Sequence, residues 1–113
     1  KGHRFKEKLI LFDVEGKFKT KSGLWIYMNA DEGDYEQIKN IIKLSDNVKF
    51  YTDDGDKITS NNAIFIIDED LIILRKNVFH ENKRLKINSD TTTISNNFDN
   101  ILHEGNVITK ILK

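Results

Sequence analysis

The chain has 113 residues, of which 38% are hydrophobic and 32% charged, a composition typical of one globular domain rather than of a disordered segment. Its 18 basic and 18 acidic residues cancel, so no excess charge draws it to nucleic acid or to an anionic bilayer. It contains no cysteine, which excludes disulfides, thiolate nucleophiles and cysteine-based metal sites.

Along the chain, short segments of alternating polar and apolar residues predict β-strands. The alternation is clear at 17–20, 56–60 and 85–89, and turn-forming residues such as Asp53-Asp54-Gly55 separate the segments. Residues 35–44 differ, because their apolar side chains have helical spacing. A short amphipathic helix is therefore the alternative there.

Internal repetition favours strands throughout. Residues 56–79 align without a gap on residues 85–108, and an earlier copy aligns with the first of these. We expect copies at approximately 24–51, 54–81 and 83–110, preceded by a half copy at 9–23. In this alignment the ambiguous segment lies on Phe65–Leu74, which predicts two strands and a turn instead of a helix.

A unit of about 30 residues cannot bury its apolar face alone, so the copies are expected to stack. Some columns of the alignment are apolar in every copy: Met28/Ile58/Ile87, Tyr35/Phe65/Ile94, Ile42/Ile72/Ile101 and Val48/Val78/Val107. Another holds Leu44 and Leu74 but His103 in the last copy, which indicates either a partly buried histidine or a frayed terminal copy. The small column Ala30/Ser60/Ser89 would allow a bend or a close approach. We expect a single all-β antiparallel domain over 1–113, made of two sheets or of one sheet folded over an apolar interior.

Residues that could carry chemistry are few. His3, His80 and His103 have no metal-ligand spacing, and we interpret them as solvated or edge residues. Asp53-Asp54-Gly55-Asp56 lacks the pattern of a calcium loop and is interpreted as a turn. Lys17, Lys19 and Lys21 indicate a solubilising edge, whereas Trp25 and Tyr27 could cover the outer face or line a rim. We therefore expect no enzyme activity, no metal and no cofactor.

The repeat resembles that of the OstA-like lipopolysaccharide-transport proteins. The resemblance is carried by Asp54–Ala63, with its Gly-x-x-Ile-x-Ser-x-x-Ala order, and by Leu71–Val78, which ends in Asn-Val. Gly23–Phe50 and Lys83–Ile108 are similar. Within this family the chain is most similar to LptC-type domains and next to the soluble LptA type; a transmembrane helix or a cleavable signal upstream would distinguish the two.

The resemblance implies an antiparallel β-jelly-roll, or β-taco, in the periplasm, anchored to the inner membrane by an N-terminal helix outside this chain. Its groove would shield the acyl chains of lipid A and pass them from the inner-membrane ABC transporter towards LptA. The jelly-roll domains of the transporter and LptA would bind by strand addition at the sheet edges, and nucleic acid is not an expected partner. The predicted groove residues are Met28, Ile42, Leu44, Val48, Ile58, Phe65, Ile72, Leu74, Val78, Ile87, Ile94, Ile101 and Val107.

Two alternatives to lipid transport remain at this stage. A structural β-repeat module of a surface protein would have a dry core with no ligand. A β-sandwich enzyme or sugar-binding domain would bring aromatic or acidic side chains together on one surface.

Overall fold

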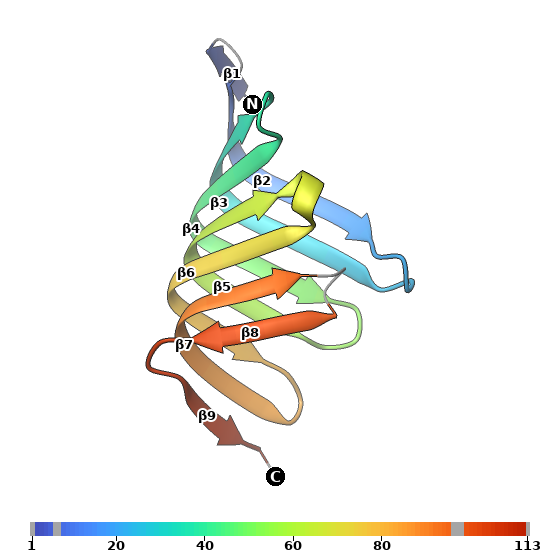
Figure 1. Ribbon diagram of the computed structural model, residues 1–113, viewed down its shortest axis with the longest axis vertical. Helices are drawn as coiled ribbons and strands as arrows, with labels where there is room; N and C mark the ends of the chain where they lie inside the picture. Colours follow the sequence, from blue (N-terminus) through green and yellow to red (C-terminus); the bar gives the residue numbers. More distant parts are fainter. Residues whose placement is uncertain (1, 6–7, 96–98, 113) are drawn as a thin grey trace.

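The computed structural model describes residues 2–5, 8–95 and 99–112, and this part of the chain is all-β. The strands form one antiparallel sheet in which each strand from β2 to β8 pairs with the strand before it in sequence, and β9 pairs with β7. Figure 1 shows them stacked along the long axis of a molecule measuring 50 × 29 × 23 Å. The strands are β1 (Gly2–Phe5), β2 (Lys8–Lys19), β3 (Trp25–Glu36), β4 (Ile41–Thr52), β5 (Lys57–Ile66), β6 (Leu71–Glu81), β7 (Leu85–Ser95), β8 (Asn100–Glu104) and β9 (Ile108–Ile111).

The segment with helical spacing is a strand, a turn and a second strand. β3 ends at Glu36 and β4 begins at Ile41. Ile38, which the helical pattern would bury, lies in the turn between them and is 76% exposed. Pairing with the neighbouring strands therefore outweighs the local periodicity, as the repeat alignment predicted. In the described residues the helical structure is limited to the 3-10 turn Ile67–Glu69.

Every long strand bends sharply near its middle, and from β3 to β7 the bend coincides with an irregularity in the strand pairing. Register shifts occur between Ser45 and Val48, for example, and between Arg75 and Val78 one repeat later. At these positions Asp46-Asn47 and Lys76-Asn77 have positive φ angles of 52–67°. Asparagine and aspartate tolerate this left-handed backbone better than most residues. The repeated Asn-Val pair thus marks the bend, with the valine as the first inward side chain after it.

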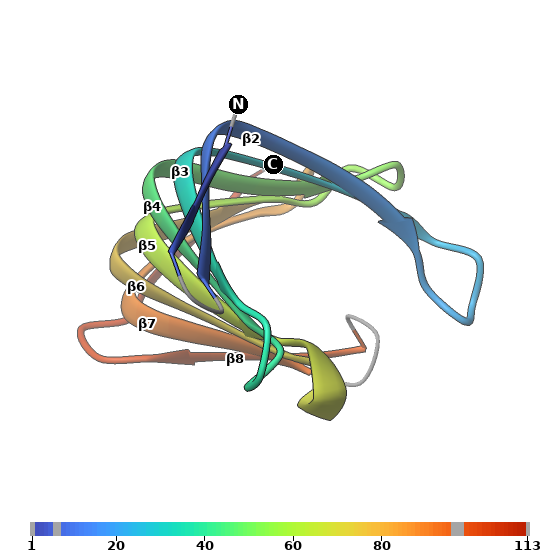
Figure 2. The same cartoon turned by 90° about the horizontal axis from the view of Figure 1, so that it is seen from above.

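The bends align from strand to strand, so the sheet folds over into a U-shaped cross-section (Figure 2). We call the two halves arm A and arm B. Arm A contains residues 14–19, 25–30, 48–52, 57–60, 78–81 and 85–89 with β9. Arm B contains residues 8–12, 32–36, 41–45, 62–66, 71–75 and 91–95 with β8. Ala30, Ser60 and Ser89, the predicted small column, are buried directly before the bend.

The last copy departs from the pattern. β8 pairs with the arm B half of β7 and β9 with its arm A half, so together they correspond to one strand interrupted at the bend. Gly105 and Asn106, both with positive φ, lie in this interruption. The prediction that Val107 lies within the apolar interior is wrong, because Val107 is 45% exposed. Val48 and Val78 are each followed by another long strand of the stack, whereas within the described residues no strand lies beyond β9 to cover Val107.

Candidate functional site

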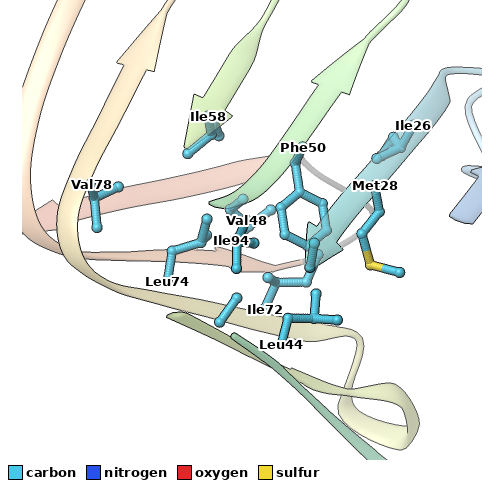
Figure 3. Close-up of a cluster of buried hydrophobic side chains, with 12 residues drawn as sticks. Ile26, Met28, Leu44, Val48, Phe50, Ile58, Ile72, Leu74, Val78 and Ile94 are labelled. Atoms are coloured by element: carbon cyan, nitrogen blue, oxygen red, sulfur yellow. The ribbon is translucent and has the colours of Figure 1, made fainter. Parts of the chain in front are cut away.

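The inner faces of the arms carry apolar rows that pack against each other. In arm A, Met28, Phe50 and Ile58 are neighbours across β3, β4 and β5. In arm B, Leu44 pairs with Ala63, which pairs in turn with Leu74. Ala63 belongs to the same buried cluster. Figure 3 shows the other members pointing into it: Met28, Phe50, Ile58, Leu44 and Leu74, with Ile26, Val48, Ile72, Val78 and Ile94. This cluster is the interior that the repeat columns predicted.

Most of the predicted groove residues meet in this interior. Those that are buried are Met28, Leu44, Val48, Ile58, Ile72, Leu74, Val78 and Ile94. Partly buried positions are Ile42, Phe65, Ile87 and Ile101; all but Ile87 pack against the buried cluster. Val107 alone of the predicted set is an exposed side chain.

The predicted groove residues leave out two of the most deeply buried side chains, Ile26 and Phe50, which are both 0% exposed. Their alignment columns are not apolar in every copy, because Asp56 aligns with Ile26 and His80 aligns with Phe50. The available signal was strand alternation, since each lies two residues from a predicted inward position.

The open side of the U is closed by side chains from both arms. Phe18 of β2 in arm A contacts Phe65 of β5 in arm B, with ring centroids 5.9 Å apart. Leu24 and Ile42 also pack against the buried cluster. Because the interior side chains fill the space between the arms, an acyl chain would have to separate the arms in order to enter.

At the C-terminal end of the stack the interior becomes polar. His80 on β6 in arm A is 7% exposed, which corrects its interpretation as a solvated residue. Its Nδ1 lies 3.1 Å from Nε2 of His103, on β8 in arm B. Its Nε2 lies 2.9 Å from Asp56 Oδ1. The two histidines therefore connect the arms directly.

Further hydrogen bonds extend this polar chain at both ends. His103 Nδ1 lies 2.7 Å from Thr92 Oγ1, and Thr92 Oγ1 lies 3.0 Å from Ser89 Oγ. At the other end, Asn82 Nδ2 donates to Asp56 Oδ1 over 3.1 Å. Burial lowers the pKa of His103 below its usual value of 6.5, and the neighbouring His80 lowers it further. His103, which aligns with Leu44 and Leu74, is thus half-buried and hydrogen-bonded on both sides.

The aromatic residues whose position the sequence left open lie on the outer face of arm A. Tyr27 and Tyr51 stack with ring centroids 5.0 Å apart. Lys17 Nζ lies 4.5 Å from the centre of the Trp25 ring, and Lys19 Nζ lies 5.7 Å from it. Because lysine ammonium groups already cover Trp25, this cluster is accounted for by cation–π contacts on an exposed sheet face.

The described residues hold no group of three or more His, Asp or Glu side chains arranged to bind a metal ion. Nor do they include a helix with the length and apolar character needed to cross a bilayer.

Comparison with known proteins leaves the family of this chain open. No model of a known protein family matches it, and no curated protein does so either.

Proposed function

We propose that the chain is a non-enzymatic scaffold of lipopolysaccharide transport in the periplasm, held at the inner membrane, whose bent sheet shields the acyl chains of lipid A. The observation that carries the proposal is the pair of facing apolar rows. They run in phase along the stack on two arms that the backbone joins only at the bend. Such an interior can accept a long apolar ligand once the arms separate on the side opposite the bend.

The energetics of this interior suit transport better than tight binding. Each methylene group of an acyl chain transferred from water into an apolar interior gains about 0.8 kcal/mol. Part of this gain would offset the cost of separating contacts such as Phe18–Phe65. Because apolar contacts have no directional requirement, a chain bound in this way can move along the rows without a large barrier.

Partners would bind at the ends of the stack. β1 at one end, and β8 with β9 at the other, each pair with one strand only in the described part of the chain. Their free backbone groups allow a strand of another protein to extend the sheet. We assign one end to the jelly-roll domains of the inner-membrane ABC transporter and the other to LptA. An LptA-type bridge would use both ends in the same manner.

Site-specific photo-crosslinking tests the proposal. A photoreactive residue in place of Phe65 or Ile72, which face the interior, should capture lipopolysaccharide in cells that assemble it. The matched controls are Ile64 and Ile73, which are adjacent to Phe65 and Ile72 on the same strands and whose side chains face outward by strand alternation. Absence of adducts from both inward positions, or equal adducts from the outward controls, would contradict lipid binding in the interior.

One observation favours a second function, that of a structural β-repeat module without a ligand. Ile26, Phe50, Ile58 and Leu74 are 0% exposed, so the interior is already well packed. Methyl NMR spectra of the purified protein with lipid A micelles distinguish the two functions. Shifts of the interior isoleucine and leucine signals indicate lipid entry, whereas shifts confined to exposed residues such as Ile38 indicate a closed structural core.

A further inference from the structure

The polar chain at the C-terminal end has only one consistent arrangement of protons when both histidines are neutral. The Asp56 carboxylate can only accept, so the proton on His80 lies on Nε2, and His80 Nδ1 is an acceptor. His103 must then donate from Nε2, which leaves its Nδ1 to accept from the Thr92 hydroxyl. Thr92 in turn accepts from Ser89. All hydrogen bonds of the chain therefore point from Ser89 to Asp56.

The chain can take up one proton without losing a hydrogen bond. If His80 carries the proton, its Nδ1 donates to His103 Nε2, and His103 Nδ1 donates to Thr92. The direction of every bond beyond His80 reverses, while the positive charge stays beside Asp56. A second proton has no such solution. With both rings charged, two N–H groups and two cations face each other across 3.1 Å.

The two histidines belong to different arms, so their contact joins β6 of arm A to β8 of arm B. β8 is a short strand of five residues with a free outer edge, and its inward side chains are Ile101 and His103. Ile101 is only partly buried, so its apolar contacts hold β8 weakly. The polar contact of β8 with arm A is made by His103.

The surroundings of the pair contain few other charges. Within the described residues, the strand neighbours of His80 are Ile58 on β5 and Ile87 on β7, and Thr109 on β9 pairs with Ile87. These side chains are uncharged, as are Ser89 and Thr92. The charged residues near the Asp56 end of the chain line the hollows on either side of it: Asp53, Asp54, Asp99, Lys83 and Arg84. Asp56 is thus the charged side chain in direct contact with the histidine pair.

We propose that His80 and His103 form a proton-operated latch between the two arms, closed at neutral pH and released in mildly acidic solution by loss of the bond to β8. The direction of the pH effect follows from the low affinity of His103 for a proton in the closed state. When β8 is released, His103 is exposed to water and its pKa returns towards the ordinary value of about 6.5. Protonation of His103 therefore favours the released state, so the closed state is fully favoured above about pH 6.5 and is progressively lost below it. The latch requires no lipid and is independent of the proposed transport function.

Histidine NMR and amide hydrogen exchange test the latch together, in a His3→Gln background so that only the two latch residues contribute ring signals. At pH 8 both rings should be the Nε2–H tautomer. Below pH 6.5 the protection factors of the β8 amides, which correct for intrinsic exchange, should fall by up to about tenfold per pH unit. Protection of β4 and β5 should change by less than about twofold over the same range, because the latch does not hold them.

The matched variant is His103→Leu, which restores the residue that the other copies carry as Leu44 and Leu74. Its β8 protection should be independent of pH between 8 and 5. If this variant does not fold, His103→Gln serves instead, because it retains polar contacts but does not titrate. Equal pH dependence in wild type and variant would overturn the latch, as would pH-independent β8 protection in the wild type. A His103 ring that becomes protonated without loss of the β8 protection would overturn it equally.

Discussion

Two leucines on strands β6 and β8 provide a direct test of which side chains face the interior and which face outward. Leu74 on β6 is 0% exposed and lies in the arm B row, whereas Leu102 on β8 is 56% exposed on the outer face. Leu74→Ala removes three buried carbon groups, worth about 2.4 kcal/mol in transfer free energy. With the cavity that remains, we expect a loss of about 3–4 kcal/mol in the free energy of unfolding.

Leu102→Ala is the matched control, and its cost should stay within about 0.5 kcal/mol because the side chain is largely in water already. Urea unfolding followed by circular dichroism measures both values. With a slope near 2 kcal/mol per molar, the midpoint of Leu74→Ala should fall by about 1.5–2 M, within the total stability of about 5–15 kcal/mol expected for a domain. Similar midpoints for the two variants would refute the packing of the arms described above.

Three other predictions follow from the interior and its bends. Ile72→Asp should cost at least about 3 kcal/mol more than Ile73→Asp in urea unfolding, because only the first places an unpaired carboxylate in the interior, and it should abolish lipid capture; equal costs would mean that the facing of β6 is reversed. Asn77→Gly should be more stable than Asn77→Ala by about 1 kcal/mol in thermal unfolding, since the position has a φ of 54°, and the opposite order would exclude a left-handed bend there. Finally, cysteines introduced at Phe18 and Phe65 and joined by a short thiol crosslinker should block lipopolysaccharide capture at position 72, because the arms can no longer separate, while the unlinked pair retains capture. Capture by the crosslinked protein would mean that lipid enters at another place.

Strand positions and the direction of most side chains could be predicted because repetition adds up weak local signals. Residues 35–44 are ambiguous alone, but their alignment with Phe65–Leu74 predicts the turn between β3 and β4 correctly. The prediction failed at Val107 for a physical reason. A column of the alignment gives the register of a residue within its strand, but its burial also depends on a following strand.

The histidine contact could not be predicted from the alignment. His80 and His103 occupy different columns, and strand register carries no information on which columns face each other across a bent sheet. Only the position of the bend, marked by Asn47 and Asn77, brings the two arms together. That signal was present as the Asn-Val repeat, but its role as a bend becomes evident only in the folded sheet.

The interruption between β8 and β9 also determines which strands of other chains can pair with this end of the sheet. A straight strand from an unfolded or misfolded chain could pair with β8 or with β9, but the kink at Gly105 and Asn106 prevents it from pairing with both. Only a segment bent at the same place could satisfy the whole edge, so fibril-like growth is disfavoured while attachment of similarly folded sheets remains possible.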